Sequence, residues 1–205
     1  NIPLDEALAM KELDHIVRLK KLGVQVDYYM MDAFWFDVNE GYRKWRPDCW
    51  PEGPKRWLDA CKREGIKPGL WFSTNLLRIG GEANTMRIIP EWESSVAEDG
   101  TTLCLFRGGY LHHLMQTLQM YVDMGIKMFK FDFAYFDAAT PDAKCTMLPT
   151  DIEEQNKNAF ISAIKEFRYR NPDVLFIGYN GFGGDMESAA CGLLAARNLY
   201  ARLEG

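Results

Sequence analysis

A lysine and an aspartate interrupt a hydrophobic stretch in the middle of the sequence, residues 125–133 (GIKMFKFDF). Such a run, opened by a glycine that can end a helix, is typical of a buried parallel strand. Lys130 and Asp132 are two residues apart, so their side chains should point to the same side near the carboxyl end of the strand. Active sites of α/β proteins lie at such ends. We therefore interpret Asp132 as a candidate catalytic carboxylate that the neighbouring ammonium keeps ionised, with a structural ion pair as the alternative.

Polar and aromatic residues also follow the other predicted strands. Two carboxylates, Asp32 and Asp132, would lie among aromatic side chains if the strands run parallel. This suits glycoside hydrolysis, because an oxocarbenium-like transition state needs an anion on one side of the sugar ring and a proton donor on the other. The strand ends would bring together Asp32, Trp35, Asp37, Trp71, Ser73, Asn75, Lys130, Asp132, Tyr179 and Asn180.

Other chemistries find less support in the sequence. His15, His112 and His113 fall on predicted helices, so no Ser-His-Asp or Cys-His set can be assembled. The cysteines form no CxxC pair and the histidines have no metal-ligand spacing, so we expect no metal and no cofactor. No GxGxxG or P-loop motif follows a strand, which argues against nucleotide binding. A lyase or aldolase that uses Lys130 as a Schiff base is a further alternative.

The composition is that of a globular protein. The chain has 205 residues, of which 47% are hydrophobic and 26% charged, enough for one domain with a substantial core. The net charge of −5 gives no reason to expect nucleic acid or an anionic membrane as a partner. No apolar run approaches the roughly 18 residues of a membrane-spanning helix. The sequence leaves the compartment open.

Amphipathic helices alternate with hydrophobic strands along the chain. We predict helices over residues 4–22, 54–64, 110–124 and 150–170, the last opened by a capping box at 150–153. Strands are predicted at 24–31, 66–72, 125–133 and 174–179, with a weaker candidate at 102–106 in a long loop. A glycine-rich turn at 180–184 leads into an alanine-rich segment that we predict to be helical.

This alternation predicts parallel βαβ units with right-handed crossovers. A doubly wound sheet and a (β/α)₈ TIM barrel both fit. Four strands and a possible fifth are fewer than the eight of a closed barrel. We therefore expect residues 1–205 to form a single α/β barrel-type catalytic domain that is incomplete, with the first and last strands lying outside this sequence.

Several short motifs occur in an order that resembles the α-galactosidase clan of retaining glycoside hydrolases, in particular glycoside hydrolase family thirty-six. That family has an Asp-Asp-Gly-Trp after a strand, then a WP segment, a GLWF strand, a Pro-Asp/Glu-Trp, a Lys-Trp-Asp strand and a glycine-rich turn ending in Asp. The corresponding segments here are Asp32 to Trp35, Trp50-Pro51, residues 65–72 (GIKPGLWF), residues 90–92 (PEW), residues 130–132 (KFD) and residues 179–185 (YNGFGGD).

The resemblance implies an exo-acting α-glycosidase with a barrel fold and a covalent glycosyl-enzyme intermediate. It makes Asp132 the nucleophile, and its carbohydrate-binding residues would include Asp32, Trp71 and Lys130. Trp35 and Asn180, which follow strands at the same edge, complete the predicted substrate-binding set. The partner would be a carbohydrate, with further domains or a homo-oligomer possible.

The sequence departs from the family pattern in three places. Ala33 replaces the second aspartate of Asp-Asp-Gly-Trp and Phe34 replaces its glycine, which leaves the identity of the sugar open. The residue after Asp132 is Phe133 where the family has a polar pair. The family's general acid/base, an aspartate after a later strand, is expected beyond Gly205, because Asp185 lies in the turn before that strand.

Two alternatives compete with this interpretation. Residues 35–40 (WFDVNE) are similar to the nucleophile signature of α-glucosidases, glycoside hydrolase family thirty-one, in which case Asp37 would be the nucleophile. The second alternative is a barrel that binds carbohydrate without cleaving it, which Ala33 and the missing acid would favour.

Overall fold

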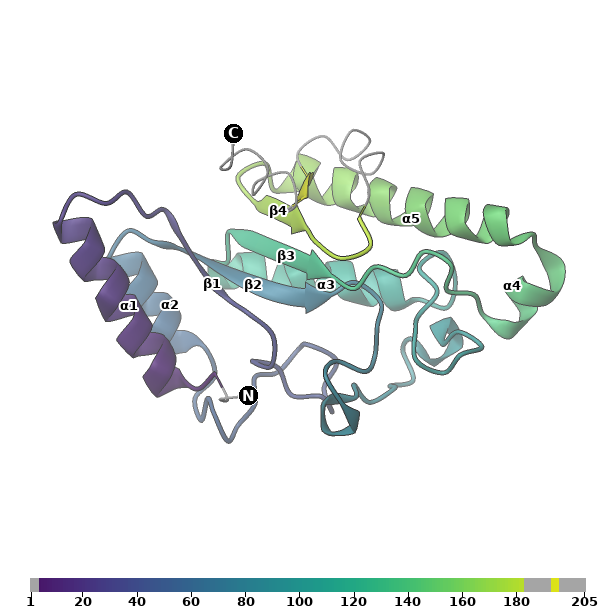
Figure 1. Cartoon of the computed structure of the whole chain (residues 1–205), viewed down its shortest axis with the longest axis horizontal. Helices are drawn as coiled ribbons and strands as arrows, with labels where there is room; N and C mark the ends of the chain where they lie inside the picture. The colour runs from purple at the N-terminus through teal and green to yellow at the C-terminus, as the bar shows by residue number, and fades with distance from the viewer. Residues whose placement is uncertain (1–3, 183–192, 196–205) are drawn as a thin grey trace.

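The computed structural model describes residues 4–182 and 193–195 of the chain (Figure 1). Its strands form one parallel sheet in the order β1-β2-β3-β4-β5. The helices are α1 (Glu6–Lys21), α2 (Lys55–Arg63), α3 (Tyr110–Met124), α4 (Pro141–Thr146) and α5 (Pro149–Arg170). The strands are β1 (Tyr28–Met31), β2 (Lys67–Ser73), β3 (Met128–Asp132), β4 (Leu175–Gly178) and β5 (Leu193–Ala195).

The order of the strands in the sheet follows their order in the sequence. A doubly wound sheet would reverse direction at a switch point, and the described strands contain no such reversal. Parallel neighbours joined by helices in this way have the topology of part of a (β/α)₈ barrel. The fold is therefore α/β with a parallel sheet, and its topology agrees with the predicted partial barrel.

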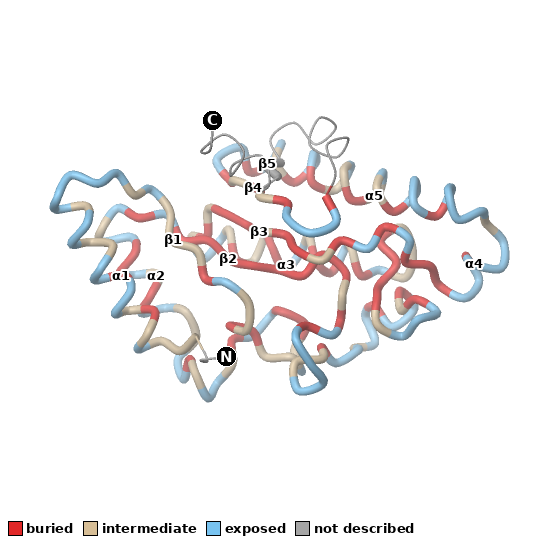
Figure 2. Tube along the Cα trace, viewed as in Figure 1, coloured by how far each residue is buried: buried red, intermediate tan, exposed pale blue. Residues whose placement is uncertain are grey.

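The two faces of the sheet carry different residues because side chains alternate along a strand. Phe129 and Phe131 point toward the helices, where Phe131 meets Phe160 of α5 with ring centroids 5.3 Å apart. Phe72 of β2 meets Tyr121 of α3 on the same side. Figure 2 shows these buried stretches running along β2 and β3. The alternate positions, which include Lys130 and Asp132, therefore face away from the helices.

The central elements match the sequence prediction closely. Helix α3 has the predicted bounds. Strand β2 begins and ends one residue later than predicted, and β3 lies inside the predicted segment 125–133. Helix α1 begins after Asp5, whose carboxylate accepts a hydrogen bond from the Leu8 amide at 2.7 Å. Strand β1 is shorter than predicted and begins at Tyr28.

Four local predictions were wrong. Residues 102–106 do not join the sheet, because Thr102 and Leu103 make only isolated bridges to neighbouring loops. No helix was predicted between residues 133 and 150, but α4 lies there. Thr150 does not cap α5, because Pro149 occupies the first turn and Leu148 is the N-cap. Leu193–Ala195, within the segment predicted as a helix, pairs with β4 as strand β5, and the rest of that segment lies outside the described residues.

The chain segments that leave β3 and β4 are pressed together. Phe133, directly after β3, has φ of +51°, a region that bulky residues rarely occupy. The Ala134 amide donates to the Asn180 carbonyl at 2.9 Å. Gly181 has φ of +92°, and a Cβ there would lie 2.1 Å from the Ala134 carbonyl oxygen. This close approach, which only glycine permits, fixes Asn180 beside the end of β3.

We predict that Gly181→Ala destabilises the protein more than Gly23→Ala. Gly23 has nearly the same φ, +91°, but nothing lies within 4 Å of the place that a Cβ would take there. Gly23→Ala therefore measures the cost of backbone strain alone, roughly 1–2 kcal/mol. Gly181→Ala adds the clash with Ala134. Urea unfolding of the two variants measures the difference, and equal losses would show that the two segments are not held in contact.

His113 gives the fold a pH dependence. It is buried on α3, and its Nε2 lies 3.3 Å from the Gly41 carbonyl oxygen. Burial lowers the pKa of His113 below its ordinary value of 6.5. The unfolded chain therefore takes up a proton near pH 6.5 that the folded chain resists, so this contribution to stability is lost as the pH falls below that value.

We predict that His113→Gln shows a smaller loss of unfolding free energy between pH 7.5 and pH 5.5 than the unmodified protein. His112→Gln, which alters the exposed histidine next to it, is the matched control and should keep the full loss. Denaturant unfolding at the two pH values tests this. The same pH-dependent loss in both variants would contradict it.

Candidate active site

Asp132 is the last residue of β3 and lies opposite Ser73 of β2 in the sheet register. Only 6% of its surface is exposed. A carboxylate buried to this extent is unfavourable unless hydrogen-bond donors surround it. The arrangement of those donors therefore decides what Asp132 can do.

Donors from β2 and from the segments that follow β3 and β4 converge on the Asp132 carboxylate. Oδ1 accepts hydrogen bonds from the Phe133 amide at 2.9 Å and from the Asn180 side-chain and backbone amides at 2.8 and 3.3 Å. Oδ2 accepts one longer bond, 3.3 Å, from the Trp71 indole. The two oxygens are thus unequal. Oδ1 is held firmly, and Oδ2 is the oxygen with more remaining capacity to form a bond.

Lys130 does not form the ion pair with Asp132 that its position in the sequence suggested. Its ammonium lies 3.2 Å from Oδ2 of Asp32 and 5.1 Å from the centre of the Tyr179 ring, and it makes no ion pair with Asp132 among the described residues. The four-carbon stem lets the ammonium reach past the end of β2 to the residue after β1. The expected partner of Lys130 was therefore wrong, although the sequence placed Lys130 and Asp132 correctly on one face.

Asp32 and Lys130 remain accessible as a pair. The Asp32 side chain is 59% exposed and that of Lys130 is 18% exposed. Asp32 also accepts a bond from the Ala33 amide at 2.8 Å, which orients its carboxylate. An exposed ion pair contributes little to stability. The pair instead presents a cation and an anion beside Asp132, suitable for polar groups of a ligand.

Trp35 lies in the core, in contrast to the prediction that it contacts a substrate. It has no exposed surface. Its indole N–H donates to the Trp71 carbonyl at 2.9 Å, and its ring packs against Trp45 and Phe72. A side chain buried in this way supports the end of β2. Trp71 is also buried, and it takes part in the site through its hydrogen bond to Asp132.

Ser73 and Asn75 hold loops rather than facing the site. The Ser73 hydroxyl donates to the Leu76 carbonyl at 2.9 Å. Asn75 binds both the amide and the carbonyl of Tyr135, each at 2.8 Å. Ser73 thus closes the turn after β2 and Asn75 fixes the segment that follows β3, roles that only the folded structure reveals.

Asp37, the nucleophile of the α-glucosidase interpretation, lies in a turn well beyond the end of β1. Its Oδ1 accepts bonds from the backbone and side-chain amides of Asn39 at 2.9 and 3.0 Å. This is a local turn cap of the kind that aspartate commonly forms. The geometry therefore favours Asp132 over Asp37. Asp185 lies outside the described residues.

The described part of the chain contains no group of three or more His, Cys, Asp or Glu side chains placed to hold a metal ion. It also contains no helix long and apolar enough to cross a membrane.

Comparison with known proteins shows what the chain is similar to. No family model matches the sequence. The chain is 25% identical over 184 residues to α-galactosidase Mel36A of Lactobacillus acidophilus, a match that covers 82% of this chain and 24% of that protein. The chain thus spans about a quarter of the length of this curated relative.

Solved structures agree in fold. The α-galactosidase of Lactobacillus brevis superposes with a TM-score of 0.65 and 17% identity, covering 98% of this chain and 29% of that chain. The α-galactosidase TtGalA of Thermus thermophilus, solved with stachyose, gives a TM-score of 0.61 and 16% identity, covering 92% and 40%. AgaA of Geobacillus stearothermophilus, a GH36 enzyme, gives 0.61 and 17%, covering 91% and 27%. In sequence and in fold, most of this chain is similar to a part of these α-galactosidases that makes up about a quarter of their length.

Proposed function

We propose that this chain carries the nucleophile of a retaining, exo-acting α-glycosidase of the α-galactosidase type, and that Asp132 is that nucleophile. The observation that carries the proposal is the Asp132 carboxylate itself, buried at the carboxyl end of a parallel strand with donors on both oxygens. The similarity to α-galactosidases supports it independently.

The proposed reaction begins with attack of Asp132 Oδ2 on the anomeric carbon of a terminal α-linked sugar. A bond forms between that carbon and Oδ2, while the bond to the leaving-group oxygen breaks and that oxygen takes a proton from a general acid. Water then releases the sugar. We assign the general acid to none of the described residues. The bonds to Oδ1 hold the carboxylate in position through both steps.

Asp32 and Lys130 are proposed to bind hydroxyl groups of the sugar. Their exposed ion pair can exchange its mutual contact for contacts with a ligand. Ala33 stands where the family pattern has a second aspartate. The proposed site therefore has one carboxylate fewer with which to bind the hydroxyl groups of the sugar. We therefore propose a terminal α-linked hexose as the sugar that the site binds.

The described elements are proposed to belong to a larger (β/α)₈ barrel. Strands β1 to β5 with sequential order would supply part of its wall, and further strands would supply the rest.

A second candidate function is carbohydrate binding without hydrolysis. Ala33 is the specific observation that favours it. Turnover of an α-glycoside distinguishes the two functions. A glycosidase turns the substrate over and needs Asp132 to do so, whereas a carbohydrate-binding protein shows no turnover.

We predict that Asp132→Asn lowers turnover of an activated aryl α-glycoside by roughly 10³-fold or more, because a neutral amide cannot form the glycosyl ester. Asp37→Asn is the matched control and should leave turnover within about twofold. Both variants are made in the protein expressed from its complete reading frame. Loss of activity in Asp37→Asn with retention in Asp132→Asn would support the α-glucosidase interpretation instead.

Asn180 is predicted to position Asp132, and not to bind the sugar as its sequence position suggested. Asn180→Ala removes the 2.8 Å bond to Oδ1, and we expect kcat to fall roughly 10- to 100-fold with little change in KM. Steady-state kinetics with the same aryl glycoside separates the two roles. A raised KM with an unchanged kcat would show that Asn180 contacts the substrate.

A further inference from the structure

The backbone directly after Asp132 is held in a strained conformation. Phe133 has φ of +51°, a left-handed value that is unfavourable for a residue with a Cβ. In this conformation the Phe133 amide donates to Oδ1 of Asp132 at 2.9 Å. The Phe133 ring lies edge-on to Trp71, with centroids 6.2 Å apart, and the Trp71 indole donates to Oδ2. The strained residue therefore supports the donors to both carboxylate oxygens.

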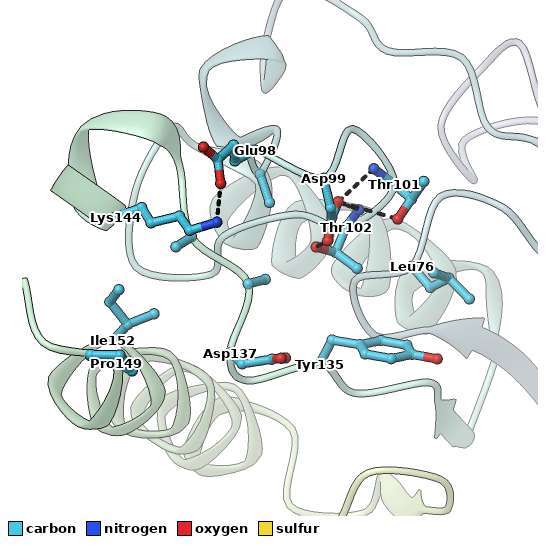
Figure 3. A pocket seen from close by; sticks show the side chains of 13 residues that line it. Leu76, Glu98, Asp99, Thr101, Thr102, Tyr135, Asp137, Lys144, Pro149 and Ile152 are labelled. Atoms are coloured by element: carbon cyan, nitrogen blue, oxygen red, sulfur yellow. Dashed lines mark hydrogen bonds and ion pairs between the residues drawn. The ribbon is translucent and has the colours of Figure 1, made fainter.

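Packing alone does not hold the segment that follows Phe133. A cavity of about 580 Å³ borders this segment, which contributes Tyr135, Asp137 and Ala138 to the lining (Figure 3). Tyr135 is 41% exposed, and Asp137 is exposed as well. Because one side of the segment meets open space, hydrogen bonds have to fix its backbone. Whatever fixes that backbone also maintains the strain at Phe133.

Two fully buried asparagines supply hydrogen bonds to this segment. Asn75, which follows β2, accepts a bond from the Tyr135 amide and donates one to the Tyr135 carbonyl, each at 2.8 Å. Asn156 of α5 donates to the carbonyls of Phe136 and Ala138 at 2.7 and 2.8 Å. Asn75 thus holds both backbone groups of the residue nearer to the carboxylate, and Asn156 holds the chain farther along.

Asn75 itself has a fixed place relative to the nucleophile. Its side-chain amide donates to the Leu103 carbonyl at 2.8 Å, and its backbone carbonyl accepts a bond from the Leu103 amide at 2.9 Å. The amide of the preceding residue, Thr74, donates to the backbone carbonyl of Asp132 at 2.7 Å. The amide group of Asn75 is therefore a rigid support on which the chain after Asp132 is tied down.

We infer that Asn75 is a positioning residue for the proposed reaction. By binding both backbone groups of Tyr135, it keeps Phe133 in the left-handed region and so aims the Phe133 amide at Oδ1 of Asp132. Relaxation of Phe133 to extended backbone would swing Tyr135 away from these two bonds. The inference rests on the proposed function of Asp132, and it adds a residue that acts on the carboxylate through the intervening chain.

The first test compares Asn75→Ala with Asn156→Ala, its matched control, in the protein expressed from its complete reading frame. Both variants lose a buried amide that binds the segment after Phe133, so both should unfold at lower urea concentration. Asn75→Ala should lower kcat about tenfold or more for an activated aryl α-glycoside, with KM within about twofold. Asn156→Ala should leave kcat within about twofold, because Asn75 still holds Tyr135. A kcat for Asn75→Ala that is no lower than that for Asn156→Ala would overturn the inference.

Glycine at position 133 gives a second readout, because glycine adopts a left-handed φ without the penalty of a Cβ. In the Asn75→Ala background, Phe133→Gly should have a kcat about tenfold above that of Phe133→Ala, which lacks the same ring but keeps the penalty. With Asn75 intact, the two variants at position 133 should agree within about twofold, because the bonds to Tyr135 impose the conformation on either residue. The same ratio of kcat values in both backgrounds would show that Asn75 does not act through Phe133.

Crystal structures separate failure of this inference from failure of the proposed function. If the unmodified protein hydrolyses no α-glycoside, the proposed function fails, and the conformation of Phe133 in Asn75→Ala still tests the positioning role. Its φ should turn negative and its amide should leave hydrogen-bond distance of Asp132 Oδ1, whereas Asn156→Ala should keep both features. A left-handed Phe133 with an intact bond to Oδ1 in Asn75→Ala would reject the inference. Asn75→Ser replaces Asn75→Ala if the latter does not fold, because the serine hydroxyl is too short to bind both backbone groups of Tyr135.

Discussion

The buried carboxylate of Asp132 is the group that the rest of the site serves. A carboxylate with 6% of its surface exposed requires partners, and these come from Trp71 near the end of β2, the amide that follows β3 and Asn180 after β4. Each donor belongs to a different strand or to the segment that follows it. The register of three neighbouring strands is therefore coupled to the geometry of one side chain.

Aromatic packing on the far face of the sheet maintains that register. Phe72, Phe129 and Phe131 fill the space between the sheet and helices α3 and α5. Trp35 reinforces it from the loop after β1 through its bond to the Trp71 carbonyl. Because cores are close-packed, a shift of β2 relative to β3 would disturb both this layer and the indole that contacts Asp132. The same alternation of side chains thus separates the face that packs against the helices from the face that carries Asp132.

The sequence was sufficient for the elements with dense hydrophobic periodicity and insufficient for contacts across strands. Helix α3 and strand β3 could be predicted because their apolar residues recur at unmistakable spacing. The short apolar run at Leu193–Ala195 fits a helix or a strand equally well, and only pairing with β4 decides. The Lys130–Asp32 pair and the close approach at Gly181 depend on segments far apart in the chain, so local sequence could not reveal them.

The central claim is that Asp132 forms a covalent bond to the sugar, and trapping that bond tests it most directly. A 5-fluoro-α-galactosyl fluoride should form a glycosyl-enzyme that breaks down slowly, because fluorine next to the ring oxygen destabilises the oxocarbenium-like transition state. Mass spectrometry of the digested protein should find the added sugar on the peptide that contains Asp132. Steady release of fluoride with no adduct, or an adduct on another carboxylate such as Asp37, would contradict the account.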